Sequence, residues 1–154
     1  MSKERKLNPS KQLLIGWASA DITPDKPIQL HGQLHERISE YVRDPLTVTA
    51  IAMESVGEDG DREQAIMLSV DVADAPRTMV EELRSLVGAR LDDFDTGKLF
   101  INTTHTHTSL LLVEEFYFPP APPGVMTPTE NLELLLFQAP TPASVLGRAA
   151  SRVA

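Results

Sequence analysis

The fold is decided by the stretch QAIMLSVDVADAPRTMVEELRSLVGARLDDFDTGKLFINTTHTHTS (64–109). Residues 64–74 form an apolar run that ends in acids, which is typical of a buried strand. Residues 77–91 are predicted to form a helix, because apolar side chains recur there at helical spacing, at Met79, Val80, Leu83, Leu86, Val87 and Leu91. Residues 98–109 begin as a buried strand and turn polar at their end. The stretch therefore predicts a strand, a helix and a second strand.

Further strands are predicted upstream of this stretch. Residues 46–55, LTVTAIAMES, are rich in β-branched and apolar side chains, and GEDGD (57–61) is a turn signal, so 46–55 and 64–74 should form a hairpin. The run LLIGWASADITP (13–24) ends at a proline and predicts a first strand, and IQLHG (28–32) a short second one. The order of these elements predicts a mixed α/β (α+β) layer fold.

Composition removes several classes of function. The chain has 154 residues, a formal net charge of −8 and no cysteine. The acidity argues against a nucleic-acid binder, and the absence of cysteine excludes disulfides and thiol nucleophiles. The polar start, residues 1–12, lacks the apolar core of a secretory signal, and no apolar run is long enough to span a membrane. We therefore expect a cytoplasmic protein without a transmembrane segment.

The chain divides into three parts by composition. Residues 1–12 are predicted to be a flexible extension, and residues 13–118 carry the α/β pattern. Residues 119–154 are predicted to be a proline-rich linker and an atypical tail. Within them, TPTENLELLLFQ (127–138) has a helical pattern, but the part after Phe137 contains no acid. We interpret this change of composition as the mark of a truncated or frame-shifted reading frame, the rival view being a natural disordered tail.

The densest chemistry lies in TTHTHTS (103–109), which holds His105 and His107. In an extended segment, residues i and i+2 point to the same face, so both imidazoles could face one pocket at the mouth of the strand. Neutral imidazole is a common zinc ligand, and the hydroxyls of Thr104 and Thr106 could orient the rings. The alternative is a pair of half-exposed histidines on a sheet edge.

Five other polar residues are weighed as contributors to the same pocket. His31 and His35, in LHGQLHER, could approach it, although loop histidines bonded to backbone are the plainer reading. Asp71, between two valines at a strand end, predicts a buried hydrogen-bonded carboxylate. Arg43 could clamp an anion or form an ordinary surface ion pair. Asp74 is expected to cap the following helix or turn.

Taken in order, the segments IGWASADITP, RDPLTVTAIAMES, AIMLSVDVAD and LFINTTHTHTS resemble the N-terminal part of the neutral/alkaline non-lysosomal ceramidases, over about residues 13–118. The resemblance implies a zinc-dependent amidase that hydrolyses an N-acyl bond of a small-molecule or lipid-like substrate by metal-activated water. It implies that His105 is a ligand of a single zinc ion and that His107 lies beside the metal and faces the substrate.

The resemblance also implies an incomplete chain and a partial domain. The family's remaining zinc ligands, a second His, a Glu and a Tyr, lie far downstream of the T-H-T-H motif, and its Ser-Gly-Pro-Gly is replaced here by Thr108-Ser109-Leu110-Leu111. Two other hypotheses are kept. The first is a different metal-dependent hydrolase built around His-x-His, and the second is a non-catalytic α/β fragment or binding module.

Overall fold

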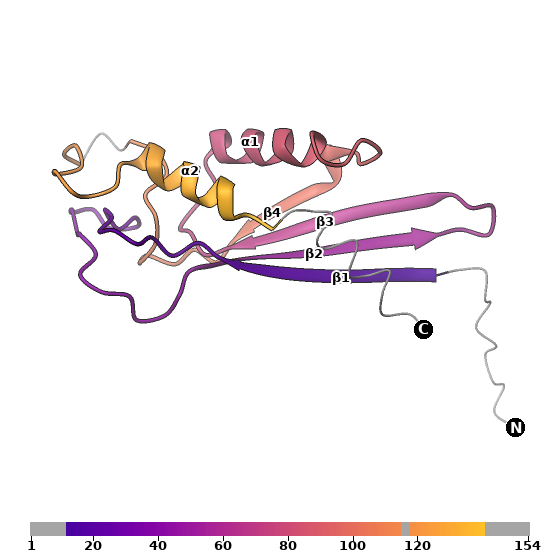
Figure 1. Cartoon of the computed structure of the whole chain (residues 1–154), viewed down its shortest axis with the longest axis horizontal. Coiled ribbons are helices and arrows are strands. Elements are labelled where there is room, and N and C mark those ends of the chain that lie inside the picture. The colour runs from indigo at the N-terminus through magenta and orange to yellow at the C-terminus, as the bar shows by residue number, and fades with distance from the viewer. Residues whose placement is uncertain (1–11, 115–117, 141–154) are drawn as a thin grey trace, which may run out of the picture.

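A four-stranded sheet forms the base of the protein, and two helices cover one of its faces (Figure 1). The computed structural model describes residues 12–114 and 118–140. The elements are β1 (Gln12–Asp21), β2 (Thr47–Val56), β3 (Arg62–Val70), α1 (Arg77–Gly88), a 3-10 turn η1 (Thr96–Lys98), β4 (Leu99–Thr103) and α2 (Pro128–Gln138). The predicted mixed α/β class is confirmed.

The strands lie in the order β1-β2-β3-β4, so strands that are neighbours in the sheet are also consecutive in the sequence. β1 pairs with β2 and β2 with β3 in antiparallel fashion, which gives the predicted hairpin over the acidic turn. β4 pairs with β3 in parallel, from Ile66 opposite Leu99 to Val70 opposite Thr103. A parallel pair needs a crossover connection, and α1 supplies it.

The predicted short strand at 28–32 does not form. Its residues instead make three isolated bridges to three different segments: Ile28 to Met126, Gln29 to Ile38 and Leu30 to Leu110. The chain then turns at Gly32, whose φ of +93° ends any extended run. The segment is therefore a cross-linking loop rather than a sheet strand.

The core lies between the sheet and the helices. Buried side chains on one face of β2 and β3 meet Met79, Leu83 and Val87 of α1. Leu135 of α2 and Met126 before it belong to the same core. Residues on both sides of position 118 therefore share one core. The tail after Pro140 and the extension before Gln12, to which we assigned separate roles, lie outside the described residues.

A capping box begins α2. The hydroxyl of Thr127 accepts from the backbone N–H of Glu130, and the Glu130 carboxylate accepts from the backbone N–H of Thr127 at 2.8 Å. The hydrogen bonds from the Thr127 backbone and side chain lower the pKa of Glu130 from its ordinary value. Neither described helix is long and apolar enough to cross a membrane.

Replacing Leu135 by alanine tests whether α2 is part of the folded core. Leu135 is fully buried, so Leu135→Ala should lower the free energy of unfolding by about 2–5 kcal/mol. Phe137→Ala is the matched control on the same helix, because that side chain is 84% exposed and its loss should cost under about 0.5 kcal/mol. Urea denaturation followed by circular dichroism measures both; equal effects would contradict the docking of α2.

Candidate functional site

The two histidines of the T-H-T-H motif lie directly after β4, at the end where β3 and β4 both finish. Their imidazole rings meet edge to face with centroids 4.8 Å apart, and the two Nε2 atoms are 3.3 Å apart. The structure thus brings the predicted pair together, but not through an extended strand. His105 has a φ of +57°, a conformation that residues other than glycine rarely adopt. This turn, not strand alternation, aims the rings at each other.

His105 is held by the backbone of the loop after β3. Its Nδ1 lies 2.5 Å from the carbonyl oxygen of Ala73. A carbonyl only accepts, so Nδ1 carries the proton and donates it. In the neutral ring, Nε2 is then an acceptor, and it lies 3.3 Å from the Nε2 of His107. An imidazole whose Nδ1–H donates to a backbone carbonyl is the usual form of a metal-ligating histidine.

His107 is held by the loop that contains Gly32. The glycine lies so close to the ring that an added Cβ would come within 2.5 Å of the His107 Cγ. From the same loop, the guanidinium of Arg37 donates to the backbone carbonyl of His107 at 2.6 Å. Gly32 and Arg37 therefore set the position of the second imidazole. No local sequence pattern indicates either role, because both residues act on His107 across a long stretch of the chain.

The two threonines that could orient the rings make other contacts. The Thr106 hydroxyl is 3.1 Å from that of Thr108, and the Thr106 backbone carbonyl accepts from Ser109. Thr104 is exposed, and its backbone N–H donates to Val70. The Thr106 hydroxyl therefore contacts its own loop, and Thr104 is tied by its backbone to the end of β3.

His31 and His35 differ in their surroundings. His31 is buried, its backbone N–H donates to Ser109, and its Nδ1 lies 3.3 Å from the carboxylate of Asp74. The expectation that Asp74 caps the following helix is wrong: Pro76 occupies the N-cap of α1, and no side chain caps it. The Asp74 carboxylate lies beside His31 instead, joining two loops that hold the pair. His35 is exposed.

The two charged candidates, Asp71 and Arg43, lie in different surroundings, since Asp71 is hydrogen-bonded and half-buried and Arg43 is exposed. The Asp71 carboxylate accepts from both the backbone N–H and the hydroxyl of Thr47, each at 2.8 Å. This half-buried carboxylate fixes the start of β2. Arg43 is highly exposed and lies 3.5 Å from its neighbour Asp44, a surface ion pair of small energetic weight.

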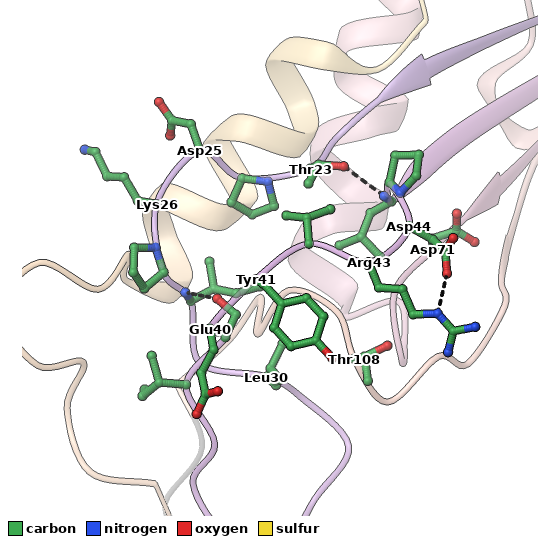
Figure 2. A pocket seen from close by; sticks show the side chains of 18 of the residues that line it. Thr23, Asp25, Lys26, Leu30, Glu40, Tyr41, Arg43, Asp44, Asp71 and Thr108 are labelled. Carbon is green, nitrogen blue, oxygen red and sulfur yellow. Dashed lines mark hydrogen bonds and ion pairs between the residues drawn. The ribbon is translucent and has the colours of Figure 1, made fainter.

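A cleft of about 950 Å³ opens next to the motif (Figure 2). Two loops, residues 23–28 and 37–46, form most of it, and Asp71, Thr106 and Thr108 complete its wall. Thr106 and Thr108 flank His107 in sequence, so the cleft and the histidine pair share one loop. Apolar side chains line part of it, among them Ile28, Leu30, Ile38 and Leu46, while Lys26, Glu40 and Arg43 add charge. Its size suits a small organic ligand.

Hydrogen bonds tie the two loops of this cleft to each other. The hydroxyl of Thr23 accepts from the backbone N–H of Leu46 at 2.8 Å, which ties the two loops together. Thr23 also donates to Asp21 at the end of β1, and these side-chain and backbone bonds lower the pKa of Asp21 below its ordinary value. The Ile28 backbone N–H donates to Ser39 in the same way.

The Nε2 atoms of His105 and His107 have the spacing of two ligands of one zinc ion. Two nitrogens bound at about 2.0–2.1 Å to one tetrahedral zinc lie about 3.3 Å apart, which is the spacing of the two Nε2 atoms. Within residues 12–114 and 118–140, no group of three His, Asp or Glu side chains converges as a metal site. The histidine pair therefore offers two donors, where a catalytic zinc normally takes three from protein.

The fold is similar to that of solved ceramidases. Neutral ceramidase from Pseudomonas aeruginosa superposes with a TM-score of 0.68 at 12% identity, over 91% of this chain and 22% of the ceramidase chain. The fold is ceramidase-like. A ceramidase structure complexed with C2 gives a TM-score of 0.66 at 13% identity, over 91% and 21% of the two chains. No protein-family model and no curated protein matches the sequence.

This chain spans about a fifth of the length of these solved proteins. The sequence resemblance to ceramidases is thereby supported at the level of the fold. Identities of 12% and 13% say nothing by themselves about individual site residues, so the histidine pair rests on its own geometry.

Adding one methyl group at Gly32 tests the packing that positions His107. Gly32→Ala should lower the free energy of unfolding by about 2–4 kcal/mol, from a clash with the ring and from positive-φ strain. Gly60→Ala is the control, because its φ of +86° is similar but its added Cβ meets open space. It should cost about 1 kcal/mol. Thermal denaturation compares the two, and imidazole NMR shifts should move only in the Gly32 variant.

Proposed function

We propose that this chain is the N-terminal part of a metal-dependent amidohydrolase that resembles neutral ceramidase and cleaves an N-acyl amide bond. One observation carries the proposal: two imidazoles with facing Nε2 atoms, 3.3 Å apart, stand at the end of two parallel strands beside a cleft. The ceramidase-like fold supports the reaction class, since the solved neighbours are ceramidases. The chain's share of their length supports its being one part of a larger enzyme.

His105 is the proposed metal ligand. The bond from Nδ1 to Ala73 selects the neutral tautomer whose Nε2 can coordinate a metal, and it fixes the ring at the strand end. A zinc ion held there would supply a water of lowered pKa and polarise the amide carbonyl.

His107 is the proposed substrate-facing residue. Its Nε2 lies next to that of His105, and its loop continues into the wall of the cleft through Thr108. From this position the imidazole can donate a hydrogen bond to a carbonyl oxygen or accept a proton. Arg37 and Gly32 hold it there, so both act as positioning residues.

The cleft is the proposed substrate site. Its apolar side chains suit a lipid-like acyl chain, and the loop charges around its mouth suit the polar part of an amide. Its wall includes Thr106 and Thr108, which flank His107, so the proposal places the reacting end of a ligand on that side of the cleft.

The remaining metal ligands are proposed to lie in polypeptide beyond this sequence. A catalytic zinc takes three protein ligands and a water, and the histidine pair supplies at most two. The solved ceramidases are between four and five times as long as the part that matches, since this chain covers only 21–22% of them.

Zinc titration of the purified chain tests the metal site. About one equivalent should bind with modest affinity, because two donors are fewer than the usual set. His105→Ala should weaken binding at least about tenfold, measured by equilibrium dialysis with metal analysis. His35→Ala is the matched control, since it removes an exposed imidazole that does not line the cleft and should leave binding unchanged. Equal loss in both variants, or none in either, would contradict the assignment.

Sequencing the coding locus past Phe137 tests the larger enzyme. Translation in all three frames should reveal a frame that continues the pattern of TENLELLL and later supplies His, Glu and Tyr in a long hydrolase domain. A genuine stop in independent isolates, with no hydrolase sequence after it, would sink the idea of a longer enzyme. The zinc titration would then still report on the histidine pair alone.

A further inference from the structure

The sheet has a second face, on the side away from the helices (Figure 1). Large apolar side chains are exposed on it. Side chains alternate along a strand, so each strand that buries one set of residues under the helices turns the other set outward. Six large apolar side chains on this outer face are between 42% and 61% exposed: Leu13, Ile15, Trp17, Ile51, Met67 and Phe100.

The strand register places four of these side chains in one row. Trp17 on β1 is opposite Ile51 on β2, Ile51 is opposite Met67 on β3, and Met67 is opposite Phe100 on β4. The row crosses the whole sheet and has an aromatic ring at each edge. Ile15 lies opposite Met53 in the next row, which widens the stripe. We call this surface the outer stripe.

The rest of the outer face is largely neutral. The row on the other side of the stripe consists of Ser19, Thr49, Ser69 and Asn102 in register. The hydroxyls of Ser19 and Thr49 already bond to each other at 2.6 Å. Along the four described strands, charged side chains on this face stand only toward its two ends, at Asp21 and Glu63. Two copies of this face can therefore meet without bringing charges of the same sign together at the centre of the contact.

The extent of the outer stripe is large for a surface left in water. Six half-exposed large side chains present on the order of 600 Å² of apolar surface, which is at the upper limit of the largest patch on a typical monomer. A stable interface buries about 800 Å² per partner, so the stripe with its neutral border is the size of one side of a specific interface.

We propose that the outer stripe docks on the same stripe of a second copy of this chain. Two sheets pack face to face about 10 Å apart with strands nearly aligned, and a two-fold axis makes the surface its own partner. With that axis along the strands, β1 of one copy faces β4 of the other, so Trp17 meets the edge that carries Phe100. The inference does not depend on the proposed hydrolase activity.

The chain carries its own reporter for this contact. Trp17 is its single tryptophan, and it lies in the outer stripe. Sedimentation velocity over low to high micromolar concentrations should show a monomer passing into a dimer. Over the same range, tryptophan emission should shift to the blue and acrylamide quenching should fall, both with the midpoint found by sedimentation.

Charge placed in the outer stripe should break the dimer. Ile51→Lys and, as a second variant, Met67→Lys should each raise the dimer dissociation constant by about 100-fold or more, while circular dichroism remains that of the unchanged chain. Leu34→Lys is the matched control: it makes the same kind of exchange at an exposed apolar residue in a loop and should leave the dimer intact.

Three results would overturn the inference. One is a monomer with exposed Trp17 at every concentration. Another is open-ended growth of aggregates without a dimer plateau. The third is a dimer that survives both folded lysine variants, because its contact would then lie elsewhere. A monomer whose Trp17 is shielded only after a downstream hydrolase segment is added would assign the outer stripe to that segment instead.

Discussion

The parallel pairing of β3 with β4 is the constraint on which the site depends. It obliges the chain to leave the sheet after Val70, cross over through α1 and return, so that both strands end at the same edge. The two segments that follow them, 71–76 and 104–109, are thereby brought side by side. The short contact between His105 and the carbonyl of Ala73 exists only because of this geometry. Without the crossover, the T-H-T-H motif would have no backbone acceptor to orient its first ring.

Much of the fold could be read from local patterns, because periodicity reflects which face of an element is buried. Residues 46–55 and 64–74 gave strands, and the helical spacing after Pro76 gave α1, although the helix ends at Gly88 rather than residue 91. The strand predicted at 28–32 does not form, because its residues pair with three separate segments of the chain. Apolarity alone does not distinguish a sheet strand from a loop that is pinned at several points.

The histidine pair could be anticipated as a pair but not in its geometry. A spacing of i and i+2 predicts a common face only in extended backbone. Here the left-handed conformation of His105 brings the two imidazole rings together instead. Arg37 and Asp74 act across long stretches of sequence, on His107 and His31 respectively, so no local pattern indicates them. Gly32 positions His107 because the imidazole lies where a side chain at residue 32 would be. Such roles depend on tertiary packing.

The segment after the motif is held from two directions. The backbone N–H of His31 donates to Ser109, Leu110 bridges to Leu30, and the buried amide of Asn131 in α2 donates to the carbonyl of Leu111 at 2.9 Å. The histidine loop and α2 are therefore linked, and we expect them to open together in local unfolding. Slow amide exchange in the loop would report the opening of α2 rather than motion of the loop itself. A helix far along the chain thus limits how often the imidazoles lose their alignment.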